Sequence, residues 1–118
     1  MNKDHLFLLR PSFADPKVGS ELFHCAVCAR IEGLLSFFPF LRTELDVSYV
    51  AFARPRAGIV ALLGEAQQSC PVLVLGAGSS VEHPAIRTSS VTGYRFVTDS
   101  ADITAYLAAV YGISSAHP

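Results

Sequence analysis

Two of the three cysteines in this 118-residue chain, Cys25 and Cys28, stand three positions apart at the start of an apolar pattern that predicts a helix. Free N–H groups and the positive end of the helix dipole favour a thiolate at such a position. A second thiol one helical turn later can form or resolve a disulfide with the first. Zinc sites use the same spacing, and an unreactive cysteine often packs as a small buried side chain. The pair is therefore a candidate for redox chemistry, metal binding or packing.

The helix that follows the pair is one of three that the sequence predicts. Its apolar residues run at helical spacing from Val27 to Phe38, and Pro39 ends the pattern. Similar stripes predict helices over residues 59–66 and 103–111. Apolar, β-branched and aromatic runs predict strands over residues 5–9, 47–52, 69–75 and 94–97. Segments 11–24 and 76–92 contain Pro, Gly and Ser at the positions expected of long loops.

The predicted order of elements is therefore β-α-β-α-β-β-α. The first βαβ unit implies two parallel strands with a right-handed crossover. The last two strands, which have no helix between them, are most simply antiparallel neighbours. We expect an α/β fold with a mixed four-stranded sheet and helices on both faces, formed by residues 1–118 as one domain.

This topology brings further candidate residues to the edge of the sheet where the first helix begins. Cys70, at the start of the third strand, and His24 are both expected near Cys25. One interpretation is a dithiol with a third thiol beside it. The alternative is a set of metal ligands made of Cys25, Cys28, Cys70 and His24.

Two arginines and the start of the last helix complete the predicted cleft. Arg54 and Arg56 follow the second strand and are expected to face the cleft, where a guanidinium would receive a substrate carboxylate. Solvated surface charges are the alternative interpretation. Asp99 or Ser100 is the expected N-cap of the last helix, and Gly112 is expected to end it.

Composition narrows the classes of function. Hydrophobic residues make up 51% of the chain, charged residues 16%, and the net charge is −1. This composition predicts a globular protein and argues against nucleic acid or an anionic membrane as the main partner. The apolar share is explained by a tight core or by a surface that a second copy covers as a homodimer. No predicted spanning helix or signal peptide is present, so we expect a cytoplasmic location, where an odd cysteine count argues against static disulfides.

The motifs resemble those of the thioredoxin-like fold in its glutaredoxin and glutathione-transferase N-terminal-domain form. The resemblance covers nearly the whole chain and depends on "HCAVC", "SCPVLVL" and "YRFVTDSADITAYLAAVYG". It implies that Pro71 follows a cis peptide bond and faces the reactive cysteine. It also implies that Thr98, Asp99 and Ser100 bind the γ-glutamyl part of glutathione. More narrowly, "DHLFLLRPSFADP", "CAVCARIEGLL", "RPR" and "PVLVL" are similar to an uncharacterised bacterial family, domain of unknown function 3088, which leaves the activity open.

Two functional hypotheses follow from these residues. In the first, the protein is a thiol–disulfide oxidoreductase or a glutathione-linked protein that acts on a small thiol or a protein disulfide. Cys25 attacks the disulfide, Cys28 resolves the mixed disulfide and Pro71 shapes the substrate groove, with no cofactor beyond glutathione as co-substrate. In the second, the chain is a non-catalytic binding module, which the missing proline between the cysteines, the long loops and Cys70 favour.

Overall fold

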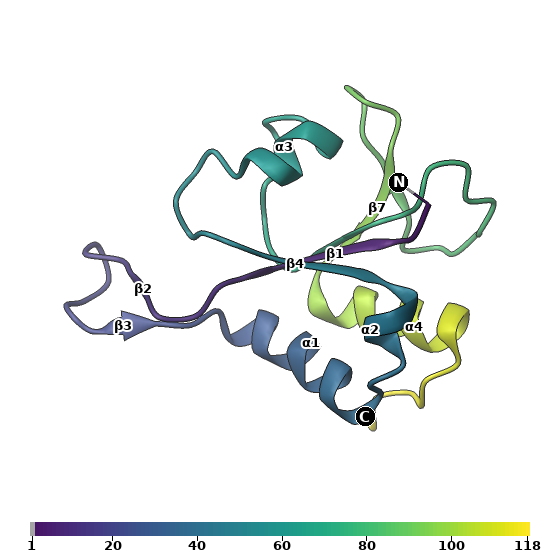
Figure 1. Cartoon of the computed structure of the whole chain (residues 1–118), viewed down its shortest axis with the longest axis horizontal. Helices are drawn as coiled ribbons and strands as arrows, with labels where there is room; N and C mark the ends of the chain where they lie inside the picture. Colours follow the sequence, from purple (N-terminus) through teal and green to yellow (C-terminus); the bar gives the residue numbers. More distant parts are fainter. Residues whose placement is uncertain (1) are drawn as a thin grey trace.

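In the computed structural model, residues 2–118 form an α/β fold with a mixed five-stranded sheet and four helices (Figure 1). The sheet has the order β4 (Asp46–Val50), β1 (His5–Leu9), β5 (Val72–Val74), β7 (Arg95–Thr98) and β6 (Arg87–Thr88). Strands β1 and β4 are parallel, and the other neighbours are antiparallel. The predicted parallel and antiparallel pairs are therefore confirmed.

The predicted number of strands is wrong. Strand β6 lies within segment 76–92, which was expected to be a loop, and pairs with β7 at the edge of the sheet. Segment 11–24 also contains regular structure, a two-stranded hairpin of β2 (Phe13–Ala14) and β3 (Leu22–Phe23). All three strands have only two residues, too few for an alternating pattern to be visible in the sequence.

The β2–β3 hairpin projects from the body of the molecule where β1 ends (Figure 1). Its base is held by the ring of Phe13, which stacks on Phe52 with 4.4 Å between ring centroids and 5° between ring planes. The hairpin leads directly into helix α1 (Ala26–Phe37). The chain between β1 and α1 is therefore an anchored arm.

The helices cover both faces of the sheet, as predicted. Figure 1 shows α1, α2 (Leu41–Glu44) and α4 (Ser100–Tyr111) on one face and α3 (Ala57–Leu63) on the other. The side chain of Asp99 accepts a hydrogen bond from the backbone N–H of Ala101 at 3.1 Å, so Asp99 is the N-cap of α4. Gly112 ends the helix with a left-handed φ of +77°.

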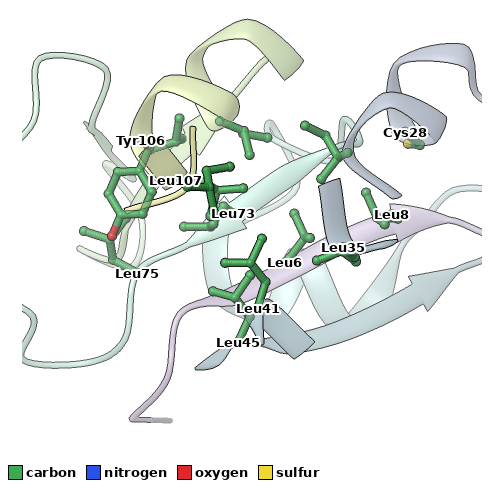
Figure 2. Close-up of a cluster of buried hydrophobic side chains, with 14 residues drawn as sticks. Leu6, Leu8, Cys28, Leu35, Leu41, Leu45, Leu73, Leu75, Tyr106 and Leu107 are labelled. Carbon is green, nitrogen blue, oxygen red and sulfur yellow. The ribbon is translucent and has the colours of Figure 1, made fainter. Parts of the chain in front are cut away.

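Each face of the sheet has its own cluster of buried side chains. Alternation along β1 sends Leu6 and Leu8 toward α1 and α4, and Phe7 toward the α3 face. Figure 2 shows the larger cluster, in which Cys28 lies beside aliphatic side chains. The first turn of α1, which carries Cys28, is thus part of the larger core.

A buried carboxylate joins the two ends of the chain. Asp4 is 8% exposed and accepts hydrogen bonds from the hydroxyls of Tyr106 (2.7 Å) and Tyr111 (2.8 Å) and from the N–H of Gly76 (2.8 Å). Burial, followed by the hydrogen bond to Asp4, raises the pKa of both tyrosines. Helix α4 and the loop after β5 are therefore fixed to the start of β1 by satisfied polar contacts.

Candidate functional site

Cys25 is the N-cap residue of α1, as the sequence predicted. Its backbone is extended, with φ −76° and ψ 113°, and its Sγ atom accepts a hydrogen bond from the N–H of Cys28 at 3.3 Å. The side chain is half-buried and its thiol is free. The sulfur therefore lies against an amide that the helix itself leaves unpaired, where negative charge is favoured.

Cys28 has the opposite environment. Its side chain is 4% exposed and packs in the larger core, while its Sγ accepts a hydrogen bond from the N–H of Leu9 at 3.5 Å. Burial and the contact with Cys25 raise the pKa of Cys28 to about 12, against an opposing effect of the Leu9 N–H. Cys28 is thus a protonated thiol at neutral pH.

Cys70 lies at the same edge of the sheet, immediately before Pro71. The Cys70–Pro71 peptide bond is cis, as the resemblance implied, and Arg54–Pro55 is also cis. Cys70 packs against the same buried cluster as the other two cysteines. Burial raises the pKa of Cys70 to about 11, although Arg56 and Arg54 act in the opposite direction. The three thiols are therefore neighbours.

Arg56 is buried, at 8% exposed, and its guanidinium is held by backbone carbonyls. Its Nε and Nη2 atoms donate to the carbonyl oxygen of Phe52 at 3.1 and 2.6 Å, and Nη1 donates to that of Gln68 at 2.8 Å. The guanidinium also lies over the Phe52 ring, 5.7 Å from its centroid. Arg56 thus fixes the loop beside Cys70, whereas Arg54 is exposed.

The other predicted residues differ in how they relate to the thiols. His24 is exposed and lines a cavity together with Cys25 and Cys28. No group of three His, Cys, Asp or Glu side chains within residues 2–118 is placed to hold a metal ion. The structure therefore does not gather the predicted ligand set around one point. Asp99 is used as the α4 cap, and Ser100, 8% exposed, accepts the Thr104 hydroxyl at its carbonyl oxygen.

A cavity of about 200 Å³ lies beside the thiol pair, and sequence reasoning missed it. Cys25 and Cys28 line it together with Glu32 and Tyr49, which stand on α1 and β4. The Glu32 carboxylate accepts hydrogen bonds from the Tyr49 hydroxyl and from the Arg42 guanidinium. The spacing of four residues between Cys28 and Glu32 was the one available signal, because it places both on one side of a helix.

The chain is a mixed α/β protein with two free thiols at a helix N-terminus. Its third cysteine precedes a cis-proline. Residues 3–115 match the family model described as protein of unknown function (DUF3088), and the chain belongs to that family. Comparison with curated proteins and with solved structures gives no match. Within residues 2–118, no helix has the length and apolar character needed to cross a bilayer.

Proposed function

We propose that this chain is a thiol–disulfide exchange protein of thioredoxin-like fold, with Cys25 as the nucleophile and Cys28 as the resolving thiol. The observation that carries the proposal is the hydrogen bond from the Cys28 N–H to the Cys25 Sγ at 3.3 Å. It stabilises an attacking thiolate at the helix start and holds the second sulfur within one turn.

The arrangement of elements supports the fold assignment. A parallel β1–β4 pair is connected through α1, and β5 and β7 follow as antiparallel strands before α4. Cys70, which precedes cis-Pro71 just before β5, packs against the same cluster as the thiol pair. In this proposal the β2–β3 arm and the edge strand β6 are additions to a thioredoxin-like sheet.

The first step is attack of the Cys25 thiolate on one sulfur of a disulfide RS–SR. A Cys25–S–S–R bond forms, the RS–SR bond breaks, and RS⁻ leaves and takes a proton from solvent. The exposed fraction of Cys25 makes this sulfur the accessible one, while Cys28 is enclosed. The division of labour between the two thiols thus follows from burial.

In the second step Cys28 attacks the Cys25 sulfur of the mixed disulfide. A Cys25–Cys28 bond forms, the second RS⁻ leaves, and the proton of the Cys28 thiol ends on that leaving group. The substrate disulfide has then gained two electrons and the dithiol has lost two. Glutathione or another small thiol restores the dithiol, because two RSH molecules become RSSR and return the electrons and protons.

Burial gives Cys28 a pKa of about 12, so its proton must be lost during resolution. Formation of the mixed disulfide removes the neighbouring Cys25 charge, one of the interactions that raise the pKa of Cys28. The resolving thiol is therefore easier to ionise after the first step than before it.

Cysteine variants test the proposal directly. The purified protein is mixed with a small-molecule disulfide, and intact mass and free thiols are measured over time. We expect the unchanged chain to form an internal disulfide, Cys28→Ser to stop at a stable mixed disulfide on Cys25, and Cys25→Ser to lose exchange by at least about 100-fold. Cys70→Ser is the matched control and should keep most of the activity. Full exchange by Cys25→Ser would refute the assignment.

A further inference from the structure

The cavity beside the thiols opens between α1 and the edge strand β4. Leu8, Leu9 and Pro11 from the end of β1 and the following segment, with Ala29 from α1, line it with hydrocarbon side chains. The imidazole of His24 also lines the cavity, beside Cys25. A ligand portion that enters this space therefore meets two sulfur atoms and a largely apolar wall, with polar side chains at its rim.

Glu32 and Tyr49, two of the three polar side chains that line the cavity besides the thiols, are hydrogen-bonded to each other and to Arg42, and His24 is the third. Glu32 accepts hydrogen bonds from Tyr49 and from Arg42, and Arg42 also donates to the Tyr49 hydroxyl at 3.1 Å. The carboxylate and the guanidinium neutralise each other at this ion pair. The rim therefore provides no net charge that would attract a strongly ionic ligand.

This cavity is separate from the cis-proline edge. Neither Cys70 nor Pro71 lines it, and neither does Arg54 or Arg56. Cys25 thus borders the cavity, whereas Cys70 lies outside it, near Arg54 and Arg56.

We propose that the cavity between α1 and β4 binds the apolar group attached to the substrate sulfur, so that the substrate is a small alkyl or aryl thiol compound in its disulfide form. The chemistry rests on the proposed function, whereas binding of the apolar group does not. Apolar cavities of about 150 Å³ hold benzene, so a cavity of about 200 Å³ suits a ring or a short alkyl chain. Burying the charges of glutathione there would be unfavourable.

A series of methanethiosulfonates tests the preference. The Cys25 thiolate attacks the sulfenyl sulfur of CH₃SO₂–S–R, a Cys25–S–S–R bond forms, and methanesulfinate leaves with the electron pair. The rate of reaction at Cys25 is measured by mass spectrometry for the methyl, propyl, benzyl and sulfonatoethyl reagents. Each rate is divided by the rate at which the same reagent reacts with N-acetylcysteine. We expect the ratio to rise about two- to threefold per methylene and to be at least about tenfold lower for sulfonatoethyl than for propyl. Equal ratios would overturn the proposal.

Filling the cavity provides a second test. Ala29→Phe places a ring at the cavity, and Ser36→Phe adds the same ring to an exposed position of α1 outside it. Ala29→Phe should abolish the advantage of propyl and benzyl over methyl, measured as the ratio of their rates within the same variant. Ser36→Phe should leave the series unchanged. An advantage that survives in Ala29→Phe would contradict the assignment.

Benzene binding to the reduced, unchanged protein supplies a readout that needs no reaction and no variant. Nuclear magnetic resonance titration should give saturable shifts centred on the amides of Leu9, Cys28 and Ala29. Absence of saturation would exclude the cavity as a site. Loss of exchange in the cysteine assay together with benzene binding would refute the proposed function alone. Exchange without apolar preference or benzene binding would refute this inference alone.

Discussion

Cys25 and Cys28 are joined by a hydrogen bond, yet Cys25 is half-buried and Cys28 is enclosed in the core. The N–H of Cys28 donates to the Sγ of Cys25 at 3.3 Å, while the Cys28 side chain is only 4% exposed. The helix start thus provides an anion-stabilising amide for the first thiol, and the packing beneath it keeps the second thiol neutral. This asymmetry leads to the first prediction.

Alkylation should distinguish the three cysteines. Burial raises the pKa of Cys28 to about 12 and that of Cys70 to about 11, so both stay protonated at pH 7.5. With iodoacetamide at this pH, we expect Cys25 to be labelled first and the other two to react at least about 100-fold more slowly than a free cysteine peptide. Between pH 8 and 10 the Cys70 rate should rise about tenfold per unit, as its thiolate fraction does. Peptide mass spectrometry gives each rate, and comparable labelling of Cys28 at pH 7.5 would contradict the burial argument.

Removing the Arg56 guanidinium should destabilise the fold. Arg56→Met leaves the carbonyls of Phe52 and Gln68 without the donors that now satisfy them in a buried place. The expected cost is about 2–4 kcal/mol in the free energy of unfolding, measured by urea denaturation. Arg54→Met, at an exposed position two residues earlier, should change it by less than about 0.5 kcal/mol. Equal effects would show that Arg56 is not a structural anchor.

A tyrosine hydrogen bond to the buried Asp4 carboxylate should stabilise the fold more than a tyrosine hydrogen bond to a carboxylate at the surface. Tyr106→Phe removes one of three donors from a buried carboxylate, and we expect a loss of about 1–3 kcal/mol in unfolding free energy. Tyr49→Phe removes a hydroxyl that also donates to a carboxylate, but at the surface, and should cost less than about 0.5 kcal/mol. Thermal unfolding of the two variants tests the contrast. A Tyr106→Phe variant as stable as the unchanged chain would refute it.

Replacing each of two glycines by alanine should change the free energy of unfolding in opposite directions. A Cβ atom at Gly76 would lie 2.3 Å from the carbonyl oxygen of Asn2, so Gly76→Ala must displace backbone and should cost about 1–3 kcal/mol in unfolding free energy. A Cβ at Gly33, within α1, would have no atom within 4 Å. Gly33→Ala should stabilise the protein by about 0.5–1 kcal/mol through helix propensity. Chemical denaturation of both variants provides the measurement.

Local sequence signals were sufficient for the framework of the fold. Pro39 and the apolar stripe before it predicted α1, and Asp99 with Gly112 predicted the limits of α4. These signals work because capping, proline geometry and apolar periodicity act within a few residues. The strands β2, β3 and β6 were missed because a two-residue strand exists only through its pairing partner.

In the candidate site, too, some features depend on neighbouring residues and others on segments that are distant in the chain. Neighbouring residues are enough to place a pair of thiols at a helix start. The enclosure of Cys28, the carbonyls around Arg56 and the contact of Glu32 with Tyr49 at a cavity are visible only in the folded chain. Burial and cavity walls are produced by segments that are distant in the chain, as with Tyr106 and Asp4, which are 102 positions apart. No local pattern encodes such contacts, because they arise only when the sheet and helices pack together.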